Sequence, residues 1–177
     1  MPAWPLYAVP GTVATPGEAK ADDIVQTQVV VIDLDHGDIV AKRDHLVHYL
    51  GNPSLEVDSG GITAEGQPKR HLYWRLTEPA EGDDIATVCR LRHAIAVKAG
   101  GDPVFRSAHQ PIRIAGSVYL KGGAKRLVKI RTHNSHVEVD LHEFAETVEA
   151  MPTMPGIEQG AGPGARARSR KPSLHEA

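Results

Sequence analysis

The chain has almost no cysteine, no long apolar run and one extended stretch without acidic residues, and the first two of these absences each exclude a class of protein. Cys89 is the single cysteine in 177 residues, which excludes an intrachain disulfide framework and favours a reducing compartment. No apolar run approaches the roughly 18 residues of a membrane span, and the first residues lack the basic-then-apolar pattern of a signal segment. We therefore expect a cytoplasmic protein with no membrane partner.

The third absence is local: no Asp or Glu lies between Pro103 and Val137, although the net charge of the whole chain is only −2. The cations of this interval are Arg106, Arg113, Lys121, Lys125, Arg126, Lys129 and Arg131. Such an uneven field suits a polyanion, for example a triphosphate or a nucleic-acid backbone. A charge run alone more often forms a solvated face, so this alternative stays open.

Composition and periodicity predict the fold class. With 41% hydrophobic and 24% charged residues, the chain falls among globular proteins, and its length allows one domain with tails. We expect strands at residues 26–35, 55–58, 71–76, 112–119, 127–131 and 137–141, and helices at 39–50, from 85 to the Gly100-Gly101 pair, and at 142–150. This order predicts an α+β fold, a mostly antiparallel sheet with packed helices. Residues 1–25 are read as an extended lead-in, 26–150 as the core, and 151–177 as a disordered tail rich in Pro, Gly and Arg.

Two carboxylates end the first predicted strand. Residues 29–35 are Val-Val-Val-Ile-Asp-Leu-Asp, and the strand period of two places Asp33 and Asp35 on one face, about 6–7 Å apart. The carboxylates repel each other unless a cation lies between them, and Mg²⁺ and Mn²⁺ favour such hard oxygen ligands. The alternative is that one Asp begins a turn while the other is solvated.

In the predicted strand at residues 71–76, one face is apolar and the other contains a histidine. Leu72, Trp74 and Leu76 alternate with polar residues and form the predicted core face, so His71 points the other way. A polar loop is expected over residues 59–70, before this strand.

Four features occur in order along the chain: Asp33-Leu34-Asp35, Ser59-Gly60-Gly61 followed by His71-Leu72-Tyr73-Trp74, Gly101-Asp102, and the stretch from Arg113 through Gly116-Ser117 to Lys121. Their order and spacing resemble the archaeo-eukaryotic primase superfamily, in particular the plasmid and phage primase–polymerase branch with the RepB-like primases. The resemblance covers about residues 26–150 and implies an RRM-like primase catalytic core.

The resemblance also implies roles for individual residues. Asp33, Asp35 and Asp102 match the carboxylates that hold Mg²⁺ or Mn²⁺ and take part in catalysis. The matches to the nucleotide-binding positions are Ser59, Gly60, His71, Arg113, Ser117 and Lys121. The implied activity is template-directed nucleotidyl transfer from nucleoside triphosphates on single-stranded DNA, in plasmid or phage replication. Because the chain lacks the P-loop pattern of a helicase, a separate replicative helicase is a candidate partner.

Each residue also fits an ordinary role, and other functions remain open. Asp102 could be a turn residue, and Arg113 and Lys121 could be solvated strand ends. The short segment before the Asp dyad favours a catalytically degenerate replication-initiation module that binds single-stranded DNA or a helicase, in a chain that is a fragment or a minimal form. A nuclease or rolling-circle initiator is a third reading, but the pairs His45/His48 and His133/His136 have the wrong spacing. A zinc site of His133, His136 and His142 lacks cysteine partners nearby.

Overall fold

A five-stranded antiparallel sheet, with strand order β2-β3-β5-β4-β9, forms the centre of the molecule. The computed structural model describes residues 4–157. The sheet strands are β2 (Thr12–Val13), β3 (Ile24–Leu34), β4 (Leu55–Ile62), β5 (Pro68–Glu81) and β9 (Lys129–His133). The other elements are the 3-10 helix η1 (Ala21–Asp23), the helices α1 (Ile39–Leu50), α2 (Asp83–Ala99) and α3 (Leu141–Ala150), and the strands β1 (Tyr7–Ala8), β6 (Ile112–Arg113), β7 (Val118–Lys121) and β8 (Ala124–Leu127). The predicted α+β class with a mostly antiparallel sheet is confirmed.

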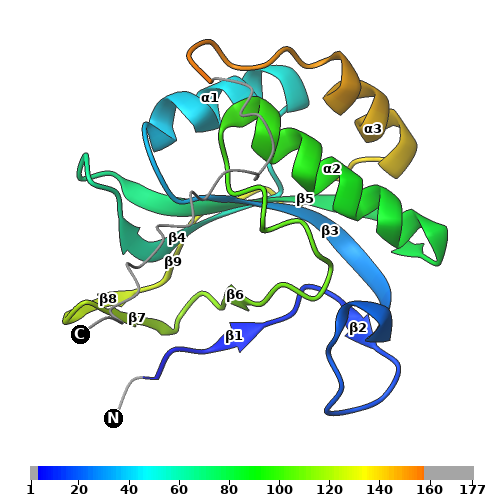
Figure 1. The fold of residues 1–177 in the computed structure, drawn as a ribbon, viewed down its shortest axis with the longest axis horizontal. Coiled ribbons are helices and arrows are strands. Elements are labelled where there is room, and N and C mark those ends of the chain that lie inside the picture. Colours follow the sequence, from blue (N-terminus) through cyan, green and yellow to red (C-terminus); the bar gives the residue numbers. More distant parts are fainter. Residues whose placement is uncertain (1–3, 158–177) are drawn as a thin grey trace, which may run out of the picture.

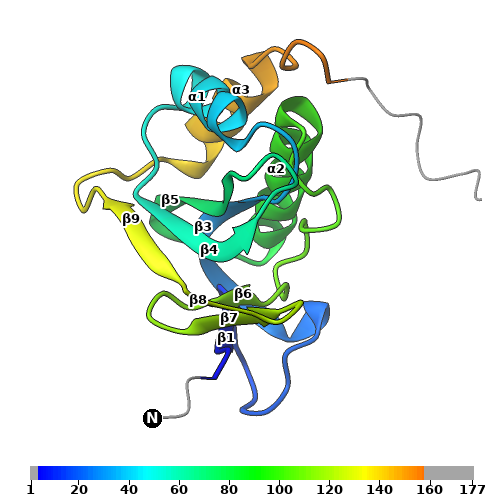
Figure 2. The ribbon, with the colours of Figure 1, turned by 90° about the vertical axis from the view of Figure 1, so that its left-hand side faces the viewer.

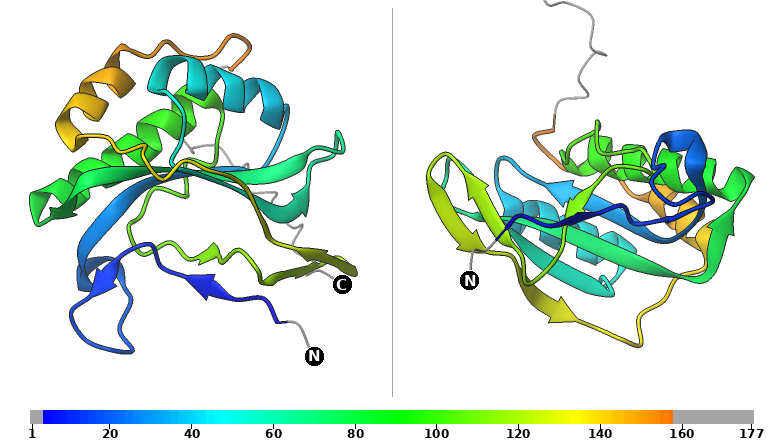
Figure 3. Two further views of the ribbon diagram at one scale, coloured as in Figure 1. Left: turned by 180° about the vertical axis from the view of Figure 1, so that it is seen from behind. Right: turned by 90° about the horizontal axis from the view of Figure 1, so that it is seen from below.

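The three helices cover one face of the sheet, and four short strands lie beneath the other (Figure 1). The lower layer consists of two antiparallel ribbons, β1 with β6 and β7 with β8. From below, β1 and β6 run across the sheet (Figure 3), and a quarter turn brings β7, β8 and β9 toward the viewer (Figure 2). The sheet is therefore the middle of three layers, and each strand faces two different environments.

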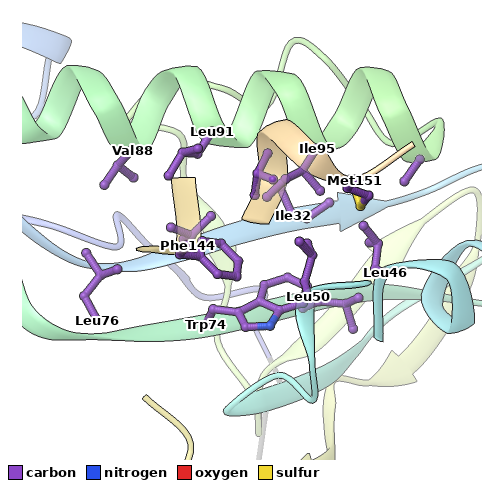
Figure 4. Close-up of a cluster of buried hydrophobic side chains, with 14 of the residues drawn as sticks. Ile32, Leu46, Leu50, Trp74, Leu76, Val88, Leu91, Ile95, Phe144 and Met151 are labelled. Carbon is purple, nitrogen blue, oxygen red and sulfur yellow. The ribbon is translucent and has the colours of Figure 1, made fainter. Parts of the chain in front are cut away.

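The main core lies between the sheet and the helices (Figure 4). Trp74 is fully buried there, with its ring 5.7 Å from that of Phe144 on α3. Leu72 and Leu76 lie on the same face of β5, as the alternation predicts. Met151 joins this core directly after α3, so the predicted tail does not begin at residue 151; residues 158–177 of that prediction lie outside the described range. None of the described helices is long and apolar enough to cross a membrane.

The lower face has a smaller core. It contains Val31, Val57, Tyr73, Phe105, Ile112 and Val128. Val31 alternates along β3 with Val30 and Ile32, which belong to the upper core. This confirms that β3 is covered on both sides, as its uninterrupted apolar run indicates.

Most predicted elements occur, with corrected boundaries. The helix at 39–50 is confirmed, and Asp38 caps it by accepting a hydrogen bond from the Ala41 amide at 3.0 Å. The helix predicted from residue 85 begins two residues earlier, at Asp83, with Gly82 as its N-cap. The polar loop predicted at 59–70 is wrong, because β4 continues to Ile62 and β5 begins at Pro68.

The structure also differs from the predicted strands at 112–119, 127–131 and 137–141, and from the predicted lead-in. Residues 112–119 form two separate strands, β6 and β7, and 127–131 divides into β8 and β9 around Val128. The strand predicted at 137–141 is reduced to an isolated bridge between Val139 and Leu76. The lead-in contains β1 and β2, which pair with β6 and β3 and were not visible as a local pattern.

Candidate functional site

Asp33 and His71 are directly opposed on neighbouring strands. The β3–β5 register pairs the two residues, and Asp33 Oδ1 lies 3.6 Å from His71 Nε2. Both side chains are on the lower face, opposite Leu72 and Trp74, because side chains alternate along a strand. The predicted direction of His71 is confirmed, although its side chain is buried and does not project into open solvent.

Two aromatic residues enclose the imidazole. The ring of Phe105 stacks on that of His71, with 6.3 Å between centroids and 13° between planes. The Tyr73 hydroxyl lies 3.5 Å from His71 Nδ1. Burial, with the nearby charge of Arg113, lowers the pKa of His71 to about 4, so the imidazole is neutral at pH 7.

Asp102, the third of the predicted carboxylate residues, follows α2 and contacts Asp33 through backbone atoms. The amide of Asp102 donates a hydrogen bond to the carbonyl oxygen of Asp33 at 3.2 Å. A Cβ on Gly101 would lie 3.2 Å from the same oxygen, so a glycine permits this close approach. The turn that ends α2 therefore brings Asp102 close to Asp33, as the resemblance implies.

Asp33 is the carboxyl whose pKa responds most clearly to its surroundings in this site. The pKa of Asp33 is raised to about 7, first by burial, then by the charges of Asp35 and Asp102. Lys69 and Arg113 act against this rise. The protonated form of Asp33 is therefore favoured far more than in an exposed carboxyl, and a cation placed among the carboxylates would favour the ionised form.

Asp35 and Asp102 have local partners as well. Asp35 Oδ1 lies 2.6 Å from His36 Nδ1, and Asp35 Oδ2 lies 3.9 Å from the Lys69 ammonium. Asp102 Oδ1 accepts a hydrogen bond from the Val104 amide at 2.9 Å. Within residues 4–157, no three His, Cys, Asp or Glu side chains converge closely enough to hold a metal ion, and this includes the zinc trio considered above. The donor chemistry fits Mg²⁺ or Mn²⁺, but the three carboxylates would hold one ion together only after moving closer to one another than they lie here.

Arg113 lies near the carboxylates from the lower layer. Its guanidinium carbon is 5.2 Å from the centre of the Tyr7 ring and 4.7 Å from that of Tyr119. Its charge acts on both Asp33 and His71, and its buried Nε has no hydrogen-bond partner among the described residues. Two aromatic rings therefore hold a planar cation beside the carboxylates, a geometry that suits phosphate oxygens.

The Ser59-Gly60 segment is part of β4 and not of a loop. The pairing with β5 shifts between Asp58 and Ile62, which marks a bulge. Gly60 has φ +83°, and a Cβ there would collide with Tyr119 on β7. Ser59 is buried. Glycine at this point allows β4 to approach β7 closely, which positions Tyr119 beside Arg113.

Ser117 and Lys121 lie elsewhere on the same segment as Arg113. The Ser117 hydroxyl is buried and donates a 3.5 Å hydrogen bond to the carbonyl of Leu6. Lys121 is exposed at the end of β7, opposite Ala124 across the hairpin. No hydrogen bond or ion pair in residues 4–157 joins either side chain to the three carboxylates. Of the predicted basic pair, the structure brings Arg113 alone to Asp33.

The sequence did not reveal several residues of the site. Lys42 is buried and donates hydrogen bonds to the carbonyls of Gly100 and, at 2.8 Å, of His36, so it joins the segments that follow Asp35 and precede Asp102. Tyr7 and Phe105 reach the site only through tertiary pairing, and no local pattern marks them. A lysine on the buried side of an amphipathic helix was the one available signal for Lys42.

The fold is similar to that of archaeo-eukaryotic primase domains among solved structures. No family model matches the chain, and no curated protein matches its sequence. Among solved structures it is similar to the primase–polymerase domain of cyanophage S-2L, with TM-score 0.61, 19% identity, and coverage of 77% of this chain and 68% of that one.

Two structures of the primase RepB′ are also similar. One has TM-score 0.51 and 13% identity over 69% of this chain and 40% of that one. The other, its catalytic domain in complex with initiator DNA, has TM-score 0.52 and 15% identity over 69% and 58%. At these identities the likeness establishes the shared fold.

Proposed function

We propose that the chain is a primase–polymerase catalytic core that carries out metal-dependent, template-directed nucleotidyl transfer on single-stranded DNA. The observation that carries the proposal is the pairing of Asp33 with His71 on one face of a primase-like sheet, with Asp102 held against Asp33 by a backbone hydrogen bond. The raised pKa of Asp33 adds support, because carboxylates that repel one another provide a favourable site for a divalent cation. The RepB′ structure with initiator DNA supports DNA as the substrate class.

Each residue has a distinct part in this proposal. Asp33, Asp35 and Asp102 would hold Mg²⁺ or Mn²⁺, which lowers the pKa of an attacking 3′-hydroxyl and stabilises the leaving pyrophosphate. Neutral His71 would donate a hydrogen bond to a phosphate oxygen of the incoming nucleotide. Arg113 would bind the triphosphate with its planar fork, while Tyr7 and Tyr119 keep that fork oriented. Ser59, Gly60, Ser117 and Lys121 remain proposed nucleotide contacts on the strength of the resemblance.

A second candidate is a catalytically degenerate module that binds DNA in replication initiation. The observation that favours it is the engagement of Asp35 with His36 and Lys69, together with the cover of Phe105 over His71. In that case the chain would bind single-stranded DNA without incorporating nucleotides.

Primer synthesis on a single-stranded template, with labelled nucleotides and Mn²⁺, separates the two candidates. We expect extended products from the wild type and their loss, by more than about 100-fold, in Asp33→Ala. Asp22→Ala is the matched control, because Asp22 is an exposed carboxylate on η1. Circular dichroism verifies that both variants are folded. Undiminished synthesis by Asp33→Ala would overturn the proposal, and absence of synthesis by the wild type with retained DNA binding would favour the degenerate module.

A further inference from the structure

The cation-rich segment includes β7, β8 and β9, which lie together at one end of the molecule (Figure 2). Lys121, Lys125, Arg126, Lys129 and Arg131 are all exposed there. In residues 4–157, the three lysines form no ion pair with an acidic side chain. We call these five residues the β7–β9 ridge.

Asp58, the acidic residue beside the ridge, already lies close to two arginines. Asp58 Oδ1 lies 3.5 Å from Arg70 Nε, and Asp58 Oδ2 lies 3.6 Å from Arg131 Nη1. The exposed acids of α3, in contrast, lie in the helical layer on the other side of the sheet (Figure 1): Glu143, Glu146 and Glu149. A polyanion approaching this molecule therefore finds unpaired positive charge on the ridge.

A pocket opens beside the ridge, between the β4–β5 hairpin and β8. Its volume is 380 Å³, and its apolar wall contains Ile62, Pro68 and Leu127. Arg126 and Lys129 from the ridge also line it, together with Asp58, the acid that lies near Arg70 and Arg131. An apolar wall with cations at the rim suits a nucleobase whose flanking phosphates remain outside.

The pocket shares walls with the carboxylate site. Gly61 lines the pocket, and a Cβ on Gly61 would meet the stem of Lys69, whose ammonium lies 3.9 Å from Asp35. Gly60 lines it too and packs on Tyr119, which stacks with Arg113. A strand that follows the ridge into the pocket is therefore carried toward Asp35 and Arg113.

We propose that the β7–β9 ridge and the adjoining pocket bind single-stranded DNA, with backbone phosphates on Lys125 and Lys129 and one unpaired base in the pocket. Only an unpaired base can enter the pocket, so a duplex makes the phosphate contacts alone. The inference rests on the proposed function only in that the bound strand serves as template; the binding itself needs neither metal nor nucleotide. Most of the affinity is electrostatic, with little preference for sequence.

Fluorescence anisotropy in EDTA tests the binding directly, with a labelled oligothymidine, a mixed-sequence strand, the matching duplex and an abasic strand of equal length. In Lys125→Ala/Lys129→Ala we expect affinity for either single strand to fall about 25-fold at 0.1 M salt, and the log–log salt slope to fall by about 1.4. Lys20→Ala/Arg90→Ala removes the same charge from exposed positions directly before η1 and on α2, elements that lie at the opposite end of the molecule in Figure 1, and should bind as the wild type does. The duplex and the abasic strand should bind more weakly than the base-bearing strands.

Equal loss in the two double variants, or none in the ridge variant, would overturn the proposal. Equal binding of abasic or duplex DNA would overturn the pocket's part in it. The proposed function fails separately: a wild type that binds through the ridge but does not synthesise primers leaves the ridge standing. A wild type that synthesises primers while the ridge variant binds unchanged refutes the ridge alone.

Discussion

The upper and lower faces of the central sheet are built from alternate residues of the same strands, and they bury different chemistry. On the upper face β3 and β5 contribute Ile32, Leu72 and Trp74, which pack against three helices. On the lower face the same strands contribute Asp33 and His71, which are covered by segments of the lower layer. The upper face gains free energy from apolar burial, while the lower face incurs a cost by desolvating ionisable groups. The upper face therefore contributes most of the apolar stabilisation, and the lower face contains the ionisable groups of the candidate site.

The largest expected effect is on the upper face. Trp74→Ala removes a fully buried indole from the main core and should lower the free energy of unfolding by about 3–5 kcal/mol. Chemical denaturation measures the change, with the midpoint and slope analysed separately. A loss under about 1 kcal/mol would contradict the assignment of this face as the main stabilising layer.

The second prediction has the opposite sign and concerns the lower face. The pKa of Asp33 in the folded protein, about 7, is above its unfolded value of 3.8, so folding becomes less favourable as pH rises from about 4 to 7. In EDTA, Asp33→Asn should therefore stabilise the protein by at most about 4 kcal/mol at pH 8 and have little effect near pH 3.5. Thermal unfolding across this pH range gives the measurement. Destabilisation at pH 8 would show that the carboxyl is a favourable structural contact and not a strained ligand.

The third and smallest prediction tests the cover on the lower face. Phe105→Ala should lower the free energy of unfolding by about 3 kcal/mol, at the low end of the range for such a substitution, because Phe105 belongs to the smaller core. It should also hydrate His71 and raise its pKa from about 4 toward the ordinary 6.5. NMR titration of the imidazole measures that pKa. An unchanged value in a folded variant would show that Phe105 does not cause the burial.

Local patterns in the sequence predicted which residues form the upper face of the sheet and some of those that form the lower face. Asp38 and Gly51 mark the ends of α1, and the alternation in β5 assigns Trp74 to the core and His71 to the other face. That Asp33 and His71 belong to one site was expected only from the family resemblance, and the β3–β5 register shows how they come together. The continuation of β4 through Ser59-Gly60-Gly61 was not predictable, because glycine disfavours strands and the pairing with β5 overrides that preference.

The lower layer could not be predicted, because its contacts join segments distant in sequence. Arg113 lies between Tyr7 and Tyr119 only because β1 pairs with β6 and β7 packs on Gly60. Asp102 and Arg113 were indicated by the family resemblance and not by any local pattern. The physical reason for the Asp102 contact, the glycine-permitted approach to the Asp33 carbonyl, is visible only in three dimensions.

Manganese-dependent stability tests the central claim, a divalent-cation site at Asp33, most directly. Thermal unfolding of the wild type and of Asp33→Asn is measured at pH 8 with EDTA and with increasing Mn²⁺. At 100 times the Kd, Mn²⁺ should stabilise the wild type by about 2.7 kcal/mol, which raises Tm by roughly 5–10 °C. Asp33→Asn should begin at a higher Tm and gain little from Mn²⁺. Equal Mn²⁺ shifts in the two proteins, or no shift in the wild type, would contradict the account.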